Sequence, residues 1–474
     1  MEPNPTPELV ATSVVAAALG QNRDLMAIGE RFAAAGFELS VVGGSVRDLL
    51  LGRPGHDIDL TTNATPEHII ETVAGWSDNV WDVGIAFGTV GVRKGNFRAE
   101  ITTYRAEKYE SDSRKPQVSF GDNLHDDLLR RDFTVNAMAV RLPSLEFVDP
   151  FGGVTDLVRR LLRTPAEAEI SFTDDPLRML RAARFASQLG FTPVADVVIA
   201  ATELRDRLEI ISAERVRDEF SKLLLGAAPR QGLEFLEGTG LGNVFIPELA
   251  ALQLEIDEHH RHKDVYEHSL TVLDQAIALE ASHEPRLEAD LVLRLAALLH
   301  DIGKPKTRRF EFGGGVSFHH HEVVGAKIAR KRLTALRFSN DVIDDVCMLI
   351  ELHLRFHGYG TGQWTDSAVR RYVRDAGPLL ARLHKLTRAD CTTRNQRRAM
   401  QLAATYDDLE ERIAALASQE ELDAIRPDLN GSEVMELLEI KPGLAIGQAL
   451  NFLLTLRLDE GPLPREQAVA RLQE

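Results

Sequence analysis

The sequence contains very little cysteine. Only Cys347 and Cys391 occur among its 474 residues. A framework of disulfides is therefore excluded, and nothing in the pattern supports a single bridge between these two residues. Because disulfides accumulate in proteins of oxidising compartments, the sequence favours a cytoplasmic protein.

Long apolar runs are also missing. A membrane-spanning helix needs about 20 consecutive apolar residues, and no run in this chain approaches that length. The segment 9–20 has the apolar character of a signal peptide, but Glu2 and Glu8 precede it and no Lys or Arg does. We interpret it as an amphipathic helix and expect no membrane association.

Positive charge is in deficit over the chain as a whole. Lys and Arg number 55 against 72 Asp and Glu, which gives a net charge of −17 and argues against a globally basic nucleic-acid binder. Phosphate binding depends on local clusters, however. Two clusters occur, Arg178, Arg181 and Arg184 in one segment, and Arg382, Lys385, Arg388, Arg394, Arg397 and Arg398 in another. A solvated face is the ordinary interpretation of the second cluster, although a helical body with such a side would suit an RNA backbone.

The chain is too long for one ordinary domain, and its length suggests two to four. With 44% hydrophobic and 27% charged residues, its composition is that of a globular protein. Short helical patterns at 45–51 and 66–73 lie among the strand-like runs, which predicts a small α/β domain. The strand-like runs are 38–42, 57–61, 87–92, 99–104 and 137–142.

Beyond about residue 153 the apolar residues recur at helical spacing almost throughout. The clearest helical patterns cover 176–189, 213–225, 265–279 and 289–300. A polar loop at 109–123 suits a mobile lid near the head, and a glycine-containing loop at 310–317 separates two groups of histidines. The expected architecture is an α/β head on a long helical body.

The most informative motif is a glycine pair followed by two aspartates. Gly43 and Gly44 precede a helical pattern, and Asp57 and Asp59 follow it on a predicted strand. Alternate strand residues point to the same side, so both carboxylates face one spot and suit Mg²⁺. The glycines allow a phosphate to approach the helix N-terminus, which Ser45 could cap. An isolated Asp-x-Asp is usually a solvated strand end, but together these features describe a triphosphate beside a metal.

Two further polar groups extend this prediction. Glu100 lies on a strand-like run that could pair near the Asp57 strand, and converging carboxylates are what a two-metal phosphoryl-transfer site requires. An edge-strand charge is the alternative. In a second group of polar residues, two adjacent arginines could bind phosphates and an aspartate and an asparagine could bind a sugar. Alternatively, the group could form a surface network of ion pairs. Its members are Arg130, Arg131, Asp132 and Asn136.

Asp175 and Arg178 stand three positions apart at the start of a predicted helix, so both can project from one face. A carboxylate can accept from the amino group of cytosine or adenine, while a guanidinium donates to the adjacent ring nitrogen. Uracil and guanine carry an N–H and a carbonyl there, which would leave polar groups unpaired. The pair could therefore select C or A without a nucleic-acid template.

These motifs, followed by Glu214-Arg215 and Glu219-Phe220, resemble in residues and order the class II tRNA nucleotidyltransferase and bacterial poly(A) polymerase family. The resemblance covers residues 25–250. It implies a polymerase-β-like nucleotidyltransferase head, then an all-α neck whose helix reads the incoming base. At Asp174 the family more often has Glu, so a separate role of this shorter side chain is in doubt.

The resemblance also implies roles for individual residues. It places Mg²⁺ at Asp57 and Asp59, and with Glu100 these form the expected catalytic set. The residues expected to bind the nucleotide are Gly43, Gly44, Arg47, Arg130, Arg131, Asp132, Asn136, Asp175, Arg178, Arg181 and Arg184.

A second constellation, of histidines and carboxylates, lies in the helical body. Such sets bind transition metals through neutral imidazole groups. Exposed helix-surface histidines are the alternative, but a His-Asp doublet at the end of an apolar helix would be partly buried. The members are His268, His300, Asp301, His321, His353 and Asp390.

The stretch 260–392 that holds this constellation resembles the HD-domain phosphohydrolases. The resemblance matches His268, His300, Asp301 and Asp390 to the metal-binding set. His321 and His353 match the extra ligands of two-metal members. It implies a divalent transition metal and phosphatase or phosphodiesterase activity. The ligands alone do not decide whether the site is catalytically active.

Four domains follow from these motifs. We expect a nucleotidyltransferase head at 1–160 and a helical neck at 161–252, for base selection and RNA binding. An HD metal domain at 253–400 and a helical tail at 401–474 complete the chain.

The expected activity is template-independent addition of CMP and AMP, from CTP and ATP, to the 3′ end of tRNA, which completes CCA. The RNA 3′ hydroxyl would attack the α-phosphate in a two-metal site. Close alternatives are a poly(A) polymerase and an enzyme that adds only CC or only A, and the acidic net charge favours a tRNA enzyme over a poly(A) polymerase. An HD phosphohydrolase with an inactive head is the alternative of another class, against which the intact Asp57, Asp59 and Arg178 argue.

Overall fold

The computed structural model divides the chain into two compact units, Met1–Pro247 and Glu248–Glu474. For residues 57, 82–84, 419 and 420 the description is confined to the backbone. The residues described are 6–53, 55, 57–84, 88–104, 123–253, 265–282, 288–312, 316–356, 359, 364–392, 395–420 and 426–473.

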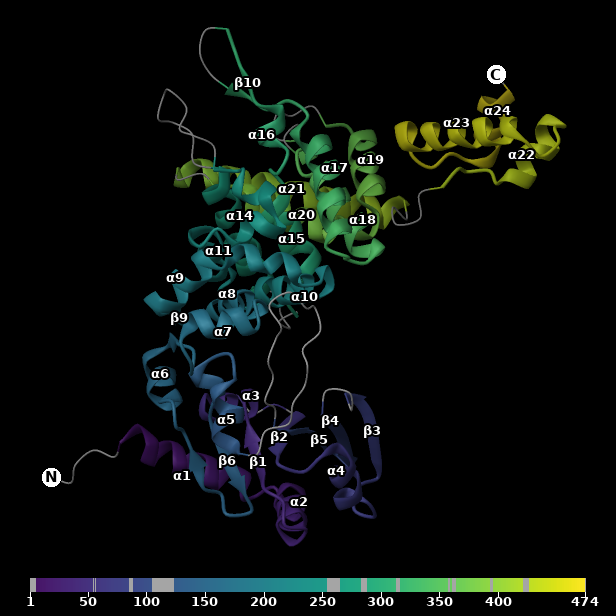
Figure 1. Cartoon of the computed structure of the whole chain (residues 1–474). Helices are drawn as coiled ribbons and strands as arrows, with labels where there is room; N and C mark the ends of the chain where they lie inside the picture. Colours follow the sequence, from purple (N-terminus) through teal and green to yellow (C-terminus); the bar gives the residue numbers. More distant parts are fainter. Residues whose placement is uncertain are drawn as a thin grey trace. The chain divides into compact units, whose positions relative to one another are not determined.

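A seven-stranded sheet forms the head of the first unit, in the order β3-β4-β5-β2-β1-β6-β7 (Figure 1). β2 and β5 are parallel, and the other neighbours are antiparallel. The strands are β1 (Leu39–Val42), β2 (Asp57–Thr62), β3 (Asn79–Gly84), β4 (Thr89–Lys94), β5 (Phe97–Thr103), β6 (Ala139–Leu142) and β7 (Phe147–Val148). The predicted runs correspond to β1, β2, β4, β5 and β6. The sequence patterns missed β7, which has only two residues, and β3, whose Asn, Asp and Gly are unfavourable in strands.

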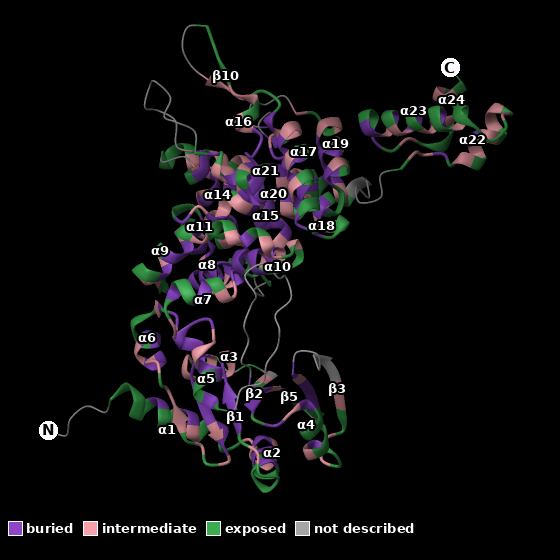
Figure 2. Ribbon diagram, viewed as in Figure 1, coloured by how far each residue is buried: buried purple, intermediate pink, exposed green. Residues whose placement is uncertain are grey.

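Helices α2 (Arg23–Ala34) and α4 (Pro66–Val73) cover one face of this sheet (Figure 2). Their apolar side chains, such as Phe32 and Ile69, share one core with Leu60 and Ile101 of the strands. Alternate residues of β5 are buried and exposed, as expected for a strand with one covered face. The other face of β5 therefore remains open to polar chemistry.

The predicted N-terminal helix is present as α1 (Pro7–Leu19). Ala11, Val15 and Leu19 are buried along one side, at a spacing of four residues. Its outer side is also apolar, because Leu9 and Val14 are exposed. The helix is therefore less amphipathic than the sequence interpretation assumed.

The rest of the first unit is helical. α8 packs against α10 and α11, and the predicted helices 176–189 and 213–225 correspond to α8 and α10 within one residue at each end. The helices are α3 (Gly44–Leu50), α5 (Leu124–Leu129), α6 (Gly153–Arg159), α7 (Ala168–Asp174), α8 (Leu177–Leu189), α9 (Ala195–Glu203), α10 (Ala213–Leu224), α11 (Pro229–Gly238), α12 (Leu241–Phe245) and α13 (Pro247–Ala250), the last of which crosses the boundary between the units. The short strands β8 (Leu161–Leu162) and β9 (Thr192–Pro193) pair in parallel beside them.

The second unit is almost entirely helical. α15 packs against α14, α18 and α20, and its sequence, apolar except for Arg294, explains why nearly all of its residues are buried. The helices are α14 (Val265–Ala281), α15 (Leu291–Leu299), α16 (Lys304–Thr307), α17 (His321–Ala335), α18 (Asn340–Leu352), α19 (Asp366–Ala376), α20 (Leu380–Asp390), α21 (Gln396–Glu420), α22 (Gly431–Leu438), α23 (Leu444–Glu460) and α24 (Arg465–Gln473). The predicted helices at 265–279 and 289–300 are confirmed as α14 and α15. No helix in the described ranges is long and apolar enough to cross a membrane.

Two predicted loops fall largely outside this description. The expected lid at 109–123 lies outside the described residues except for Asn123. The glycine run 313–315 lies outside them as well, between the two-residue strands β10 (Arg309–Phe310) and β11 (Val316–Ser317).

Candidate functional site

Strands β2 and β5 bring two of the predicted carboxylates together. Asp59 and Glu100 are register partners in the parallel pair, so their side chains leave the sheet on the same side. Both residues are exposed, whereas the next residues along, Leu60 and Ile101, are buried in the core below. Asp57 begins the same strand, and the described part of it is its backbone. The open face of the sheet therefore carries the acidic site.

The glycine pair lies where β1 joins α3, next to these carboxylates. Gly43 has φ +69°, and a Cβ there would lie 2.8 Å from Nη1 of Arg131 and 4.0 Å from Oδ2 of Asp59. The absence of a side chain thus lets the Arg131 guanidinium approach the backbone beside the carboxylate. Asp127 Oδ2 holds this guanidinium by accepting from Nη2 at 3.1 Å. Asp127 is not among the predicted site residues, although its position four residues before Arg131 signals such a pair.

The expected capping role of Ser45 is wrong. No side chain caps α3, because Ser45 is already the second residue of the helix and its hydroxyl lies beyond the capping position. Its Oγ instead accepts a hydrogen bond from the backbone N–H of Asp59 at 2.9 Å. This contact ties the start of α3 to the strand that carries the acidic residues.

The predicted sugar-binding residues form a closed network between the head and α8. Arg47 Nη1 donates to Asn136 Oδ1 at 2.5 Å, and Asn136 Nδ2 donates to Asp132 Oδ1 at 2.9 Å. Arg181 Nε donates to the other oxygen of Asp132 at 2.8 Å. Although burial opposes ionisation, Arg181 and Asn136 hold the pKa of Asp132 well below its usual range. In this conformation the network satisfies the polar groups that were expected to face a sugar.

Asp175 immediately precedes the N-cap of α8, and Arg178 lies in the first turn of the helix. Asp175 Oδ1 accepts from the N–H of Leu177 at 3.1 Å, and its Oδ2 lies 3.6 Å from Nη2 of Arg215. Arg178 Nη1 donates to Ser171 Oγ at 2.8 Å, and its Nη2 donates to the carbonyl of Arg130. Both members of the pair are thus held by neighbours, and both remain partly exposed.

Ser171 and Arg215 are contacts of this pair that the site prediction did not include. Arg215 belongs to the quoted motifs, but Ser171 carries no sequence signal, since only the turn between α7 and α8 brings it to Arg178. Asp174 makes no side-chain hydrogen bond or ion pair with any residue in the described ranges. The anchoring of Arg178 therefore comes from Ser171 and the Arg130 carbonyl.

Arg184 differs from the other arginines of α8 because it is buried. Its Nη1 donates to Glu219 Oε1 at 3.0 Å and joins α8 to α10. Burial and the neighbouring charge of Arg181 lower the pKa of Arg184 to about 10. The structure therefore places Arg184 in an internal ion pair.

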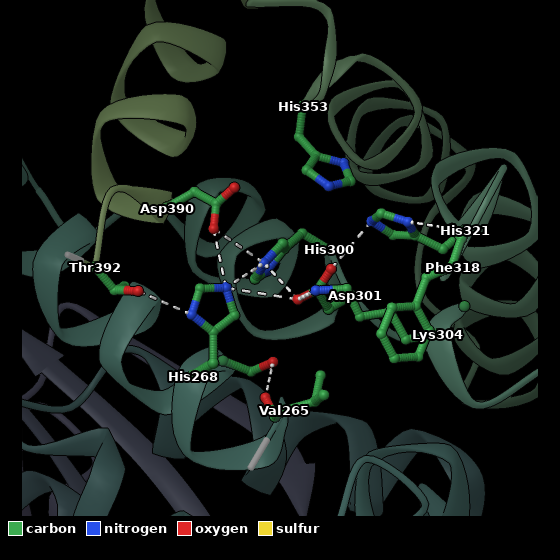
Figure 3. Close-up of polar contacts among 12 residues, drawn as sticks. Val265, His268, His300, Asp301, Lys304, Phe318, His321, His353, Asp390 and Thr392 are labelled. Carbon is green, nitrogen blue, oxygen red and sulfur yellow. Dashed lines mark hydrogen bonds and ion pairs between the residues drawn. The ribbon is translucent and has the colours of Figure 1, made fainter. Parts of the chain in front are cut away.

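The second unit gathers all six predicted metal ligands at the ends of five helices (Figure 3). Two groups have ligand atoms within 4.8 Å of one another, His268, His300 and Asp390 in one and Asp301, His321 and His353 in the other. Asp301 lies between the groups. Its Oδ2 is 3.3 Å from Nε2 of His300, and its Oδ1 is 3.2 Å from Nε2 of His321. The arrangement suits two ions that share one carboxylate.

Outer contacts orient the four imidazole rings so that each Nε2 faces the centre (Figure 3). The Nδ1 atoms of His300, His321 and His353 lie 2.9, 2.8 and 2.6 Å from the backbone carbonyl three residues earlier. Nδ1 of His268 instead lies 3.2 Å from Oγ1 of Thr392. A hydrogen on Nδ1 leaves the Nε2 lone pair for a metal.

The site fits a divalent metal on two further observations. Nε2 of His353 is buried and has no hydrogen-bond partner among the described residues, which is costly for a polar atom. Burial lowers the pKa of His300, but the carboxylates of Asp301 and Asp390 outweigh it and raise that pKa to about 10. Positive charge is therefore favoured at the centre, and a metal ion would supply it.

Lys304 is a neighbour of this centre that the site prediction did not include. Its Nζ lies 2.6 Å from Oδ2 of Asp301 and 5.7 Å from the centre of the Phe318 ring. Lys304 begins α16 three positions after Asp301, and its backbone N–H donates to the Asp301 carbonyl at 2.9 Å, which closes the turn between them.

Two arginines of the second basic cluster are held in ion pairs. Arg382 pairs with Asp290 at 2.6 Å, and Arg388 pairs with Asp407 at 2.7 Å. Arg394 lies outside the described residues. These pairs join elements within the unit, so Arg382 and Arg388 are less available to an RNA backbone than the sequence indicates.

Three protein families match consecutive parts of the chain. The "Poly A polymerase head domain" matches residues 39–163, and the "Probable RNA and SrmB- binding site of polymerase A" matches residues 190–253. The "HD domain" matches residues 265–418. The third match includes most of α21, which crosses the expected boundary at residue 400.

Individual proteins match the chain over different lengths. The CCA-adding enzyme of Lactobacillus delbrueckii is 46% identical over 46% of this chain and about half, 54%, of its own length. The A-adding tRNA nucleotidyltransferase of Deinococcus radiodurans is 36% identical over 90% of this chain and 93% of its own. Among solved structures, the Bacillus stearothermophilus CCA-adding enzyme in complex with CTP is 26% identical, with a TM-score of 0.66 over 95% of this chain and 96% of its own.

Proposed function

The chain belongs to the family of tRNA nucleotidyltransferases and bacterial poly(A) polymerases, and from this premise we propose that it adds CMP and AMP to the 3′ end of tRNA. The arrangement on β2 and β5 carries the proposal. Asp59 and Glu100 are register partners on an open face, and the Arg131 guanidinium lies beside Asp59 at Gly43. Carboxylates for a metal and a cation for a phosphate therefore meet at one point.

The proposed reaction is attack of the RNA 3′ hydroxyl on the α-phosphate of CTP or ATP, with release of pyrophosphate. Asp57, Asp59 and Glu100 would hold Mg²⁺, which when bound lowers the proton affinity of the hydroxyl and neutralises phosphate charge. Arg131, fixed by Asp127, would bind the triphosphate. The contribution of the chain itself is mainly positioning.

Base selection follows from the anchoring of Arg178. Two of its nitrogens are held by Ser171 and by the Arg130 carbonyl, so the guanidinium has a defined position before a nucleotide binds. A fixed guanidinium with Asp175 beside it would accept cytosine or adenine and leave polar groups unpaired with uracil or guanine. Because the groups that would recognise the base are protein side chains, no template strand is needed.

A direct test supplies tRNA that lacks its terminal CCA with CTP alone, ATP alone, or both. We expect growth by two nucleotides with CTP and by three with both. Long A tails on unrelated RNA would contradict the proposal and indicate a poly(A) polymerase. Loss of a terminal phosphate without growth would favour the hydrolase.

A second candidate is addition of the terminal A only. It is favoured by the length of the match to the A-adding relative, since the stronger identity to the Lactobacillus CCA-adding enzyme covers only 46% of this chain. In the same assay, an A-adding enzyme would leave tRNA without CCA unchanged with CTP and would extend tRNA ending in CC by one A.

For the second unit we propose a divalent transition metal centre with phosphatase or phosphodiesterase activity. The two ligand groups around Asp301 support it. Elemental analysis of the purified chain should find up to two transition metal ions per molecule, and hydrolysis of a phosphodiester should stop when a chelator removes them.

The division into a head at 1–160, a neck at 161–252, an HD domain at 253–400 and a tail at 401–474 is likewise proposed. Limited proteolysis tests it: cleavage near residue 253 would support the boundary between neck and HD domain, whereas resistance at residue 401, inside α21, would contradict the last boundary. The cytoplasmic location remains a prediction that a fluorescent fusion would test.

A further inference from the structure

The open face of the head sheet continues beyond Glu100 across two more strands. Glu100 is the register partner of Gly91 on β4, and Gly91 is the partner of Trp81 on β3. Since paired residues point to the same side, Trp81 and Gly91 share the face of Asp59 and Glu100. Their neighbours along the strands, such as Val90, face the core on the other side.

Trp81 lies directly over the backbone of β4. A Cβ on Gly91 would lie 2.0 Å from its indole, so only glycine permits this packing. The Cζ of Arg98 is 5.2 Å from the centre of the indole ring, within the range of a cation–π contact. The indole is partly exposed. An aromatic ring and a guanidinium therefore form a platform one strand away from Glu100.

A second row on the same face carries two arginines opposite each other. Arg93 on β4 is the register partner of Arg98 on β5, and both are exposed. Like charges directly opposite in a sheet are destabilising unless an anion lies between them. The Arg93 side chain makes no hydrogen bond or ion pair with any residue in the described part of the chain. Arg93 is therefore available to a phosphate, and Arg98 places a second positive charge directly opposite it.

We propose that Trp81, Arg93 and Arg98 form the subsite for the 3′-terminal nucleotide of the RNA acceptor, an inference that rests on the proposed transferase function. Stacking on an aromatic ring and phosphate contacts from arginines are how proteins hold single-stranded RNA ends. The base stacks on the platform of Trp81 and Arg98, and the phosphate lies over the two arginines.

The order of the strands explains why the acceptor binds on this side. Gly43 and Arg131 lie toward β1, on one side of Asp59, whereas Glu100 and Trp81 lie toward β3, on the other. An in-line displacement needs the attacking hydroxyl and the leaving pyrophosphate on opposite sides of the phosphorus. With the triphosphate near Arg131, the hydroxyl must approach from the side of β5.

The test measures equilibrium binding of an RNA hairpin with an acceptor end and a 3′-deoxy terminus, without nucleotide, for Trp81→Ala and Arg93→Ala. Each change should weaken binding about tenfold, as loss of a stacked base or a phosphate contact does. The matched control is Lys94→Ala, which removes one positive charge and a cation–π contact with Trp76 on the opposite face, at 4.6 Å. It should leave RNA binding unchanged.

A second arm uses an RNA whose last nucleotide has no base. If Trp81 stacks on that base, Trp81→Ala should not weaken the binding of this RNA any further. Arg93→Ala should still weaken it about tenfold. Equal losses for Trp81→Ala with both RNAs, or a loss with Lys94→Ala as large as with Arg93→Ala, would overturn the subsite. The binding arm is independent of turnover. A wild-type chain that binds as described but extends no RNA would therefore refute the proposed function and leave the subsite in place.

Discussion

In the second unit the six metal-ligand candidates come from the ends of five helices, and four of them are buried, whereas in the first unit Asp59 and Glu100 lie on an exposed sheet face. The three buried histidines are oriented by contacts of their Nδ1 atoms with backbone carbonyls before any ion binds. On the sheet, strand register places the two carboxylates next to each other.

The two units differ in how their charged groups are stabilised. A buried centre must be pre-arranged, because an unsatisfied polar group in the interior is costly. An exposed face needs less pre-arrangement, because the cost of an unpaired polar group is small where solvent can reach it. In the first unit, buried polar groups instead hold side chains in place. The hydrogen-bond network from Arg47 through Asn136 and Asp132 to Arg181 is an example.

The largest expected effect concerns the exposed site. Asp59→Asn should lower nucleotide addition by at least about a hundredfold to a thousandfold, because it removes a charge from the centre where phosphate charge is neutralised. Elemental analysis should find the metal content of the second unit unchanged. Glu71→Gln, an equally exposed loss of charge on α4, serves as the control. If Asp59→Asn altered that metal content, the two sites would not be independent.

The next effect concerns the buried centre. His353→Ala should lower the metal content by about one ion per molecule, because three-ligand groups bind weakly once a ligand is lost. The change should also lower the melting temperature of the second unit, since metal affinity contributes to folding. His319→Ala, at an exposed position nearby, should change neither quantity. Unchanged metal content in His353→Ala would remove that histidine from the ligand set.

A smaller effect is expected on stability when a buried ion pair is broken in either unit. Glu280→Ala removes the buried carboxylate that pairs with Arg294 in the second unit, and Glu219→Ala removes the one that pairs with Arg184 in the first. Each should cost about 3–5 kcal/mol in the stability of its own unit. Hydrogen exchange resolved by segment can separate the two. The exposed pair of Asp344 and Arg330 provides the control, because Asp344→Ala should cost about 0–1 kcal/mol. Losses spread equally over both units would contradict this independence.

The smallest effect concerns selectivity. Ser171→Ala should raise incorporation of UMP and GMP relative to CMP about three- to tenfold, because Arg178 keeps its bond to the Arg130 carbonyl and the net loss of one hydrogen bond is about 0.5–1.5 kcal/mol. The turnover number with CTP should change little. Ser187→Ala removes a buried hydroxyl that donates to the Leu223 carbonyl, away from Arg178, and should leave selectivity unaltered. Rescue by Ser171→Thr would distinguish positioning from simple loss of packing.

Much of the fold could be predicted from sequence because the patterns are strong where burial is one-sided or complete. The predicted helices 66–73 and 176–189 and the strand 57–61 agree with the structure within one residue at each end. β3 was missed because Asn79, Asp82 and Gly84 are residue types that are unfavourable in strands. Such a strand lacks the apolar signal on which pattern recognition depends.

The candidate sites divide in the same way. The six metal-ligand candidates were predicted by type and order, and the structure brings all of them together. Asp127, Ser171, Lys304 and Thr392 were missed as neighbours, because their roles depend on which side chain the fold places beside them. The sequence also treated Asp132 and Asn136 as an open sugar-binding group, whereas the structure closes them into a network with Arg47 and Arg181.

The sequence by itself determined which chemical groups this protein has and in what order, because motifs such as Asp57 with Asp59 or His300 with Asp301 are local and their periodicity decides which face they share. Only the tertiary structure decided which distant groups meet. Strand register placed Glu100 beside Asp59 and aligned Trp81 with both, and helix packing brought Asp390 to His268. Register and packing depend on the burial of side chains far apart along the chain, so no local pattern specifies them.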